Sequence, residues 1–418
     1  MIFFESLKEY KNMTPGLSRI KKFFEGMGNP HDTIKVIHIA GTNGKGSTAA
    51  FISEILKAGG YKTALYTSPH LIDVKERIKI SGENIPSRVF YNLSHKYLDK
   101  AVKCGLSCFE YLTAIAFIYF VEQKVDVAVI ETGLGGRFDA TNIIKNPLVC
   151  VITSVAKEHQ EILGNTIERI AFEKVGIIKK SAYVVCGGLP KAAIAVVKNK
   201  VKTSYLYGKD FKALINKSSI LGQNFDYTSE NIKLKNIEIN LLGEHQVANA
   251  SVAVCVVDLL SKKEYALDET NIRMGLRNTV WSGRFDVRKV NFGDESFEII
   301  IDGAHNVQGF NAFLKTFKQL GFSKKKRTFI FAVMKEKKYK VIVEKISPFA
   351  KKIILPKIHN DRAASPDVLK TEFSKYIIKN KIYSVDSVKS ALSMINTGET
   401  AIVIGSLYLA GEVLTIIQ

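Results

Sequence analysis

Cysteine is scarce in this chain of 418 residues, and its spacing argues against both a disulfide framework and a zinc site. The five cysteines are an odd number, and no two of them form a C-x-x-C pair. Cys104 and Cys108 lie near each other in the sequence, but neither a second pair nor a nearby histidine accompanies them. This usage is typical of reduced thiols in the cytosol.

A long hydrophobic run is also absent. The longest one, near residues 111–121, is too short to span a bilayer, and the N-terminus has neither a basic region nor a signal cleavage site. We therefore expect a soluble cytoplasmic protein without a membrane partner. The length predicts two or three domains and is sufficient for a large buried core.

Acidic residues are in deficit, because 40 Asp and Glu stand against 60 Lys and Arg, which gives a net charge of +20. Nucleic-acid-binding proteins concentrate their cations on one face or in a tail, whereas the lysines here are scattered along the whole chain. The run at 324–327 is more typical of a basic turn. We expect a solvated surface that attracts anionic substrates, and we keep a nucleotide-dependent nucleic-acid-binding protein as an alternative from another class.

Against these absences stands a glycine-rich loop between a strand and a helix. Residues 36–39 form an apolar strand, and apolar residues recur at helical spacing after position 47. Gly41, Gly44 and Gly46 lie between them, so the backbone can approach a ligand without a Cβ in the way. A strand, a glycine loop and a helix in this order direct backbone N–H groups and a helix N-terminus at a phosphate.

The polar residues of this loop also suit a nucleotide. Lys45 would supply charge to the terminal phosphates, and Ser47 or Thr48 would place a hydroxyl near the metal. The spacing differs from the common G-x-x-x-x-G-K-[ST] pattern, because two residues separate Gly41 from the next glycine and another glycine follows the lysine. A general nucleotide triphosphatase is therefore a loose match.

Two later stretches add candidate residues to this site. An apolar strand over 125–130 ends on Glu131, and an acidic residue beside a phosphate loop is where nucleotide enzymes hold Mg²⁺. The run at 133–136 resembles a dinucleotide fingerprint, but Phe138 occupies the position that needs glycine or alanine. Pro69 forces Ser68 out of helical geometry and predicts a tight loop at 67–70.

The order of predicted elements gives the fold class. The N-terminal part, residues 1–283, begins with a helical segment at 1–33 and is expected to form a P-loop-type ATP-binding α/β domain with a mostly parallel sheet. Residues 181–240 give only shorter strands, and 275–284 predict the connection to the next domain. In the part from 284 to 418, strands at 297–302, 327–333, 352–356 and 401–404 alternate with helices at 306–320, 365–378 and 386–395. This alternation predicts a smaller, parallel, Rossmann-like α/β domain.

Eight short stretches carry a resemblance to a known family. They lie, in this order, at residues 41–47, 67–70, 109–117, 131–142, 173–177, 243–250, 302–306 and 405–408. Together they resemble the folylpolyglutamate synthase and dihydrofolate synthase family, which is related to the Mur ligases. The resemblance covers nearly the whole chain, and the unusual glycine loop is itself this family's form.

The resemblance implies a set of ATP-binding residues. It places the terminal phosphates at Lys45 and Arg284, the adenine at Asn249 and the ribose at Asp302. The other ATP-binding residues belong to the glycine loop and are Thr42, Asn43, Gly44, Gly46, Ser47 and Thr48.

It also implies a metal site and a modified lysine. Ser68, Glu131 and His159 would surround Mg²⁺. The lysine that matches Lys174 is carbamylated by CO₂ in the family, which turns an ammonium into a carboxylate-like ligand and reverses its charge. This chemistry needs a deprotonated lysine, which burial and nearby Mg²⁺ would favour.

The remaining implied roles fall in the C-terminal part. His305 resembles the residue that faces the reaction centre from the second domain, so that Lys45, Lys174 and His305 form the expected catalytic set, and Ser406 would help His305 to hold the substrate glutamate. Two departures bear on the geometry around the site. Glu158 stands where the family usually has Asp, and 335–338 replaces an Asp-Lys-Asp-like segment.

The implied reaction is ATP-dependent amide bond formation. A folate-type carboxylate, either dihydropteroate or a reduced folate or both, attacks the γ-phosphate of ATP to give an acyl phosphate, which L-glutamate then attacks. Because acyl phosphates hydrolyse in water, the two domains should close over the site. A Mur-type ligase that uses a UDP-sugar acceptor is the competing interpretation. We expect a monomer that acts on small molecules and not on nucleic acid.

Overall fold

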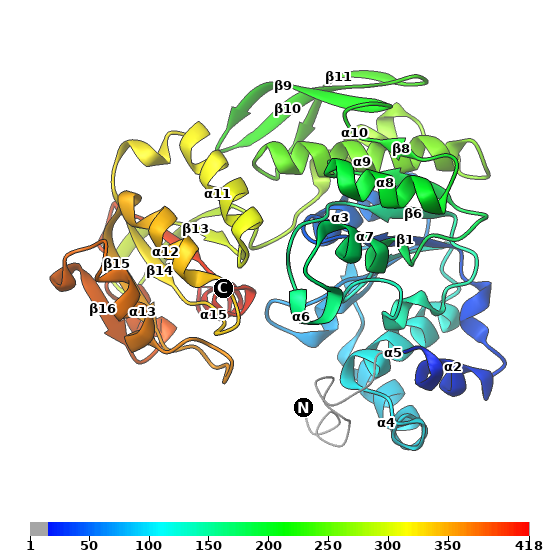
Figure 1. Ribbon diagram of the computed structural model, residues 1–418, viewed down its shortest axis with the longest axis horizontal. Coiled ribbons are helices and arrows are strands. Elements are labelled where there is room, and N and C mark those ends of the chain that lie inside the picture. Colours follow the sequence, from blue (N-terminus) through cyan, green and yellow to red (C-terminus); the bar gives the residue numbers. More distant parts are fainter. Residues whose placement is uncertain (1–15, 418) are drawn as a thin grey trace.

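The computed structural model describes residues 16–417, which fold into two lobes (Figure 1). The larger lobe contains an eight-stranded and a three-stranded sheet, and the smaller lobe contains a six-stranded sheet. Helices accompany all three, so the predicted α/β class is confirmed. Of the helix expected over 1–33, the structure shows α2 (Ser18–Glu25), while residues 1–15 lie outside the described residues.

The eight-stranded sheet of the larger lobe has the strand order β4-β3-β2-β5-β1-β6-β7-β8. Its neighbouring strands are parallel except for the β2–β3 and β3–β4 pairs, which are antiparallel. The strands are β1 (Val36–Ala40), β2 (Thr63–Tyr66), β3 (Ile78–Ile80), β4 (Glu83–Asn84), β5 (Val127–Glu131), β6 (Val149–Ile152), β7 (Tyr183–Cys186) and β8 (Tyr205–Leu206). Both β1 and β5 are buried along their whole length, as parallel strands covered on both faces are.

Helices cover both faces of this sheet. They are α3 (Lys45–Ala58), α4 (Ser87–Cys104), α5 (Cys108–Glu122), α6 (Gln160–Leu163), α7 (Ile167–Val175), α8 (Lys191–Lys200), α9 (Glu244–Ser261) and α10 (Glu269–Asn278). Ile37 and Ile39 belong to the core shared with α3 and α9, whereas Val36 belongs to the core shared with α2 and α5. The alternation along β1 therefore separates two helical layers.

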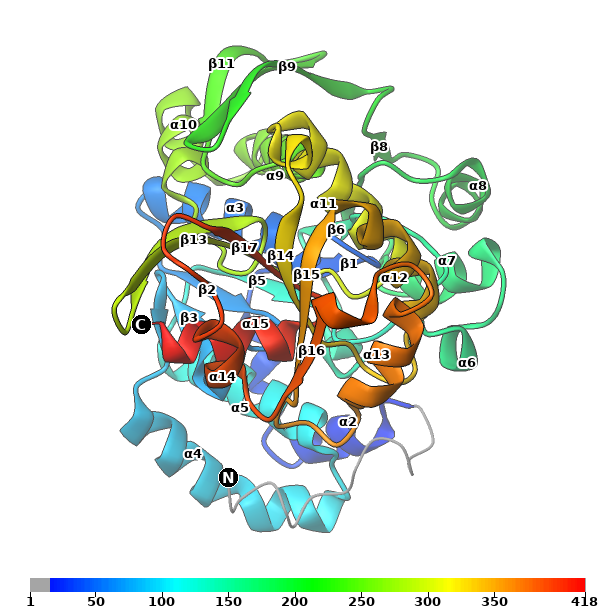
Figure 2. The same ribbon diagram turned by 90° about the vertical axis from the view of Figure 1, so that its left-hand side faces the viewer.

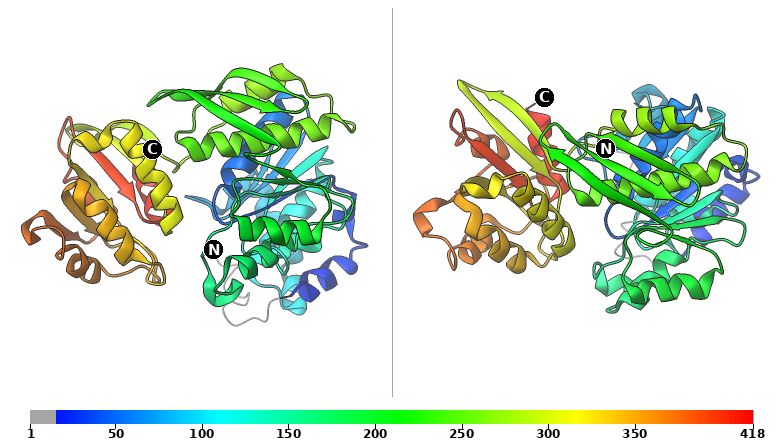
Figure 3. Two further views of the ribbon diagram at one scale, coloured as in Figure 1. Left: turned by 45° about the horizontal axis from the view of Figure 1, so that its top comes forward. Right: turned by 90° about the horizontal axis from the view of Figure 1, so that it is seen from above.

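The segment that gave only short strands forms a separate antiparallel sheet. Its strands are β9 (Phe211–Ser219), β10 (Gly222–Ser229) and β11 (Lys233–Ile239), in the order β11-β10-β9. Phe225, Tyr227 and Ile237 turn inward and join the core around α9, while the alternate positions are half-buried in β10 and exposed in β11. The sheet thus covers α9 (Figure 3), and most side chains of this helix are buried.

The smaller lobe is built on a sheet in the order β12-β13-β17-β14-β15-β16. Its strands are β12 (Asp286–Phe292), β13 (Glu295–Asp302), β14 (Arg327–Phe331), β15 (Ala350–Pro356), β16 (Ile382–Val385) and β17 (Thr400–Ile404). Its helices are α11 (Val307–Gln319), α12 (Tyr339–Ile346), α13 (Pro366–Phe373), α14 (Val388–Leu392) and α15 (Leu407–Ile416). Ile300 faces α11–α13 and Ile299 and Ile301 face α14 and α15, so the sheet lies between two helical layers (Figure 2).

Two expectations for this lobe and its connection need correction, and one helix had no prediction. The prediction of a parallel domain holds for β13 to β17 but not for β12, which is antiparallel to β13. Strand β12 has only Val290 buried, and so it gave no core signal. Helix α12 was not expected in the lysine-rich segment. The predicted connection at 275–284 began too early, because α10 continues to Asn278, with Ile272 and Leu276 buried.

The arrangement of the two parallel sheets places the loops that carry polar residues. In the larger lobe, the loops after β1, β5 and β6 leave the carboxyl ends of neighbouring strands. In the smaller lobe, the loops after β13, β14 and β17 do the same. Ligands of open α/β sheets bind outside the carboxyl ends of strands. Within residues 16–417, no helix has the length and apolarity that crossing a membrane requires.

Packing of α10 on α3 gives a test of the fold. A Cβ on Gly275 would lie 2.4 Å from the Cα of Ile55, so Gly275→Ala forces the two helices apart. We expect it to lower the free energy of unfolding by about 1–3 kcal/mol, as overpacked cores do. Urea denaturation followed by circular dichroism measures this. Met274→Ala on the exposed face of α10 is the control and should change stability by less than about 0.5 kcal/mol. Equal midpoints for both variants would contradict the packing.

Candidate active site between the two lobes

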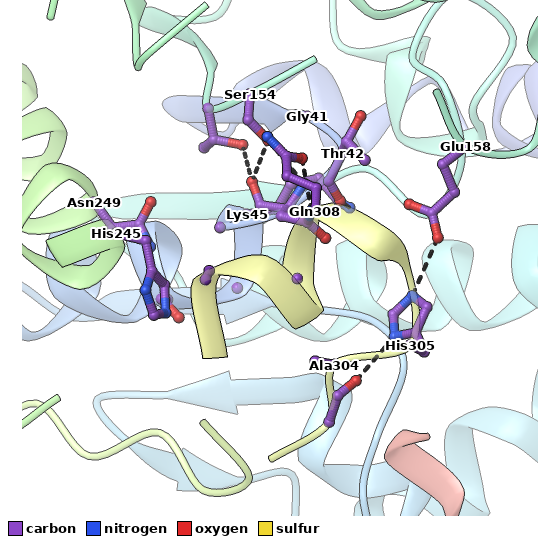
Figure 4. A pocket seen from close by; sticks show the side chains of 18 of the residues that line it. Gly41, Thr42, Lys45, Ser154, Glu158, His245, Asn249, Ala304, His305 and Gln308 are labelled. Carbon is purple, nitrogen blue, oxygen red and sulfur yellow. Dashed lines mark hydrogen bonds and ion pairs between the residues drawn. The ribbon is translucent and has the colours of Figure 1, made fainter. Parts of the chain in front are cut away.

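Side chains from both lobes line one cavity of about 360 Å³ (Figure 4). The larger lobe contributes the glycine loop after β1, Glu131 at the end of β5 and the segment after β6. The smaller lobe contributes Arg284 and the loop after β13. The predicted site residues that line the cavity are Thr42, Asn43, Gly44, Lys45, Gly46, Ser47, Ser68, Glu131, His159, Lys174, Asn249, Arg284, Asp302 and His305.

The glycine loop is fastened to the end of β6. The backbone N–H of Asn43 donates to Ser154 Oγ at 2.9 Å, and Thr153 Oγ1 donates to the carbonyl oxygen of Asn43 at 2.7 Å. A Cβ on Gly41 would lie 1.9 Å from Thr153 Oγ1, and Gly44 has a φ of +85°, so both positions require glycine. Helix α3 begins directly after Gly44, and its first-turn N–H groups have no partner within the helix. The loop therefore presents backbone donors to an anion.

A buried carboxylate faces the lysine of this loop. Glu131 is 4% exposed, and one of its oxygens lies 3.7 Å from Lys45 Nζ. The backbone N–H of Ser68 donates to its other oxygen at 3.1 Å. Burial raises the pKa of Glu131 above its usual value, and the charge of Lys45 opposes this effect. The three residues thus meet at one wall of the cavity.

Lys174 is a buried amine beside the same loop. It extends from α7, is 4% exposed and donates from Nζ to the carbonyl oxygen of Gly41 at 2.8 Å. Burial, and then the charge of Lys45, lower the pKa of Lys174 to about 7. Near neutral pH a substantial fraction of this lysine is therefore the nucleophilic, neutral amine.

The segment after β6 places an imidazole and a carboxylate at the edge of the cavity. His159 has a φ of +50° at the start of α6, and burial lowers its pKa to about 4, which favours the neutral form. Glu158 Oε1 lies 3.2 Å from His305 Nε2 and 3.0 Å from Lys337 Nζ. Burial alone would raise the pKa of Glu158, but hydrogen bonds and charges from His305 and Lys337 lower it.

The smaller lobe contributes a corner at the end of β13. Asp302 is 6% exposed and accepts hydrogen bonds from the backbone N–H groups of Phe285 (2.9 Å) and Ala304 (2.8 Å). Burial raises the pKa of Asp302, and the nearby Arg284 opposes this. His305 Nδ1 lies 2.9 Å from the carbonyl oxygen of Gly303, which orients its ring toward Glu158.

Two predicted residues do not line the cavity. Thr48 is fully buried in α3, and among residues 16–417 its hydroxyl has no hydrogen-bond partner. Ser406 is 2% exposed and caps α15, because its Oγ accepts from the N–H of Leu409 at 3.1 Å. Their implied roles in nucleotide and glutamate binding remain predictions.

Several residues of the site had no predicted role. His245 lies in one of the stretches that carried the resemblance, and burial, followed by the charge of Arg284, lowers its pKa to about 4. Gln308 in the first turn of α11 belongs to no recognisable sequence motif. In the structure, its Oε1 accepts a hydrogen bond from the side-chain amide of Asn43 at 2.8 Å. Lys337, which pairs with Glu158, lies in the segment 335–338 that departs from the family pattern. That departure was the only feature of the sequence that drew attention to this residue.

Comparison with known proteins matches both lobes to domain families. Residues 39–257 match the Mur ligase middle domain, and residues 283–407 match the Mur ligase glutamate ligase domain. The dihydrofolate synthase/folylpolyglutamate synthase of Bacillus subtilis is 33% identical over 414 residues, which covers 96% of this chain and 94% of that protein. The folylpolyglutamate synthase of Lacticaseibacillus casei is 35% identical and covers 94% and 92%.

The chain belongs to the folylpolyglutamate synthase/dihydrofolate synthase family of the Mur ligases. A solved structure described as an FPGS–AMPPCP–folate complex, where FPGS stands for folylpolyglutamate synthase, is similar to this chain with a TM-score of 0.81 and 31% identity. The similarity covers 99% of this chain and 97% of that chain. The predicted family is thereby confirmed. The lobes of this family member correspond to the two matched domains, and its cavity lies between them.

Because Gly41 packs closely against the end of β6, adding a methyl group at this position should weaken nucleotide binding. Gly41→Ala would push the loop away from Thr153, and we expect it to weaken binding of an ATP analogue by about tenfold or more, the effect of 1–3 kcal/mol of overpacking. Titration calorimetry with AMPPCP measures this. Gly188→Ala is a matched control, because Gly188 lines the same cavity but a Cβ there meets no atom within 4 Å. Unchanged affinity in Gly41→Ala would contradict the proposed loop contact.

Proposed function

We propose that this protein is an ATP-dependent ligase that adds L-glutamate to a folate-type carboxylate, dihydropteroate or a tetrahydrofolate polyglutamate, through an acyl phosphate. The observation that carries the proposal is the single cavity in which the glycine loop of one lobe meets the Asp302–His305 corner of the other. The relatives that are similar along nearly the whole chain are named dihydrofolate synthase/folylpolyglutamate synthase and folylpolyglutamate synthase, and this favours the proposal over a UDP-sugar ligase or a nucleic-acid-binding protein.

The nucleotide would lie with its phosphates on the glycine loop. The first-turn N–H groups of α3 and the ammonium of Lys45 supply donors and charge for them, and Arg284 reaches the same cavity from the other lobe. Asn249 lines the cavity beside Gly44 and suits an adenine, since its amide both donates and accepts. Asp302 uses one bond on each oxygen for the backbone, so it can still accept bonds from ribose hydroxyls.

Ser68, Glu131 and His159, which all line the cavity, would hold a magnesium ion. Among residues 16–417, no three or more His, Cys, Asp or Glu side chains converge on one point. Mg²⁺ is usually held by one or two carboxylates together with waters and substrate phosphates, so a single buried carboxylate beside the phosphate loop suits it. When bound there, Mg²⁺ neutralises charge on the transferred phosphoryl group.

Lys174 suits the carbamylation that the family resemblance implies. Its amine is desolvated, and the pKa near 7 leaves much of it neutral. The nitrogen of a neutral amine can attack the carbon of CO₂ and lose a proton, which gives an anionic carbamate. Lys45, which now repels the Lys174 ammonium, would then become its counter-ion. The carbamate would add a second anionic group to the cavity that Glu131 also lines.

The residues present can support both steps of ligation. In the first step, a carboxylate oxygen of the folate acid attacks the γ-phosphorus and ADP leaves, while Lys45 and Arg284 stabilise the developing negative charge. In the second step, the neutral α-amine of glutamate attacks the acyl carbon, the bond between this carbon and the phosphate oxygen breaks, and the nitrogen loses a proton to solvent as inorganic phosphate leaves. We place the amine near His305 and the glutamate carboxylates near Ser406. Closure of the lobes excludes water from the acyl phosphate.

We further propose that the chain acts as a monomer in the cytoplasm, with the domain boundary between residues 283 and 284. The glycine loop and the Asp302–His305 corner that line the cavity both belong to one chain, which supports this proposal. The first strand of the smaller sheet begins at Asp286, directly after the proposed boundary.

Turnover with a panel of acids tests the function. The protein should convert ATP, L-glutamate and dihydropteroate or a tetrahydrofolate into ADP, phosphate and the glutamylated product, identified by mass spectrometry. UDP-muramoyl acceptors should give no product. Ligation to the UDP-sugar acceptor alone, or ATP-dependent retention on DNA at physiological salt without ligation, would overturn the proposal.

The modified lysine gives a second test. Lys174→Ala should lower turnover by about a hundredfold or more, because it removes a charged group from the phosphoryl site. Short carboxylic acids such as acetate should restore part of the activity by replacing the carbamate. Lys180→Ala, a change at an exposed lysine a few residues later, is the control and should be fully active. Wild-type turnover in Lys174→Ala with an unchanged thermal melt would exclude the carbamate role.

A further inference from the structure

Glu158 of the larger lobe contacts three polar or charged side chains of the smaller lobe. It lies in the loop after β6 of the larger lobe, and its side chain is 11% exposed. One oxygen lies 3.2 Å from His305 Nε2 and 3.0 Å from Lys337 Nζ. The other accepts from the amide of Asn306 at 3.0 Å. A single carboxylate thus binds three side chains from two separate loops of the smaller lobe.

The side-chain amides of Asn306 and Asn43 connect this contact to the phosphate loop. Asn306 Nδ2 donates to Asn43 Oδ1 at 3.0 Å, and Asn43 Nδ2 lies 3.3 Å from Asn306 Oδ1. Asn306 also caps α11, since its Oδ1 accepts from the N–H of Gly309 at 2.8 Å. Gln308 of the same turn accepts from Asn43. The start of α11 is therefore joined both to the phosphate loop and to Glu158.

A second charged contact between the lobes differs in its surroundings. Glu244 at the start of α9 pairs with Lys315 and Gln319 of α11. Its side chain and that of Lys315 are 39% and 59% exposed, so solvent screens this pair. Exposed ion pairs contribute little, whereas loss of one partner from a buried pair leaves the other charge desolvated and alone. Of these two carboxylates, Glu158 is the one whose removal should matter.

We propose that Glu158 is a positioning residue that holds the smaller lobe closed over the phosphate loop and thereby sets His305 against the reaction centre. The part concerning His305 rests on the proposed function, whereas the closure rests on the contacts alone. His305 and Lys337 follow the carboxyl ends of β13 and β14 in one sheet, so they move together with the lobe. Opening the lobes exposes Glu158 and its three partners to water, which keeps closure reversible for substrate entry.

A double-mutant cycle read by small-angle X-ray scattering tests this proposal. Glu158→Gln removes the charge from the larger lobe, and Lys337→Met removes one partner from the smaller lobe. Each should raise the radius of gyration of the ligand-free protein. The double variant should be no more extended than either single one, because both changes break the same contact. Glu244→Gln is the matched control between the same lobes and should scatter as the wild type does.

Kinetics separate closure from other roles of this segment. We expect Glu158→Gln to lower kcat by about tenfold and to weaken AMPPCP binding severalfold, because Arg284 and Asp302 move away from the glycine loop together with the smaller lobe. Glu158→Asp keeps the charge on a side chain one methylene shorter and should recover part of kcat and of the compact form.

Three outcomes would overturn the proposal. Scattering curves of Glu158→Gln and Lys337→Met that match the wild type would remove the closing role. Additive extension in the double variant would show that the two residues act separately. A changed Mg²⁺ dependence without a changed radius of gyration would show that Glu158 acts through the adjacent His159 instead. Scattering needs no turnover, so failure of the proposed ligase reaction would leave this test of closure intact.

Discussion

The attachment of the β1–α3 loop to the end of β6 fixes the geometry on which the rest of the site depends. The carbonyl oxygen of Asn43 accepts hydrogen bonds from the hydroxyls of Thr153 and Ser154, and its N–H donates back to Ser154. These bonds hold the backbone in a turn that directs the first N–H groups of α3 into the cavity. Lys174 is placed relative to the same turn, because it bonds the carbonyl oxygen of Gly41. One loop thus determines where phosphate and the buried amine meet.

The charges around this loop favour an anionic ligand. The carboxylates of Glu131 and Asp302 already accept backbone hydrogen bonds, so they are partly neutralised before any ligand binds. Lys45 and Lys174, in contrast, repel each other, which is one cause of the low pKa of Lys174. A polyphosphate between them would relieve this repulsion, and so would conversion of Lys174 to an anion. The same buried amine therefore suits both nucleotide binding and modification.

The parts of the fold that depend on short sequence patterns could be predicted from the sequence. The strand, glycine loop and helix from Val36 onward follow from apolar spacing, and Glu131 ends its strand as the pattern predicted. The partners of Glu158 are different in kind, because Lys337 lies 179 residues away and meets it only when two sheets face each other. Side-chain direction is equally hidden, and Ser406 shows this by capping α15 instead of lining the cavity. Strand β12 escaped notice because pairing with β13, not burial, holds it in the sheet.

Because the carboxyl edges of the two sheets face each other, phosphate binding and lobe closure share a residue. The backbone of Asn43 belongs to the loop that is fastened to β6, while its side chain bonds Asn306 and Gln308 of the other lobe. A ligand shifts a conformational equilibrium only as far as it interacts differently with the two states. In the closed form, the side-chain amide of Asn43 beside a bound phosphate is hydrogen-bonded to the smaller lobe. In the open form, the same amide is hydrated. That difference, added to the buried charge contact at Glu158, gives the nucleotide a physical route to bias closure before the second substrate arrives.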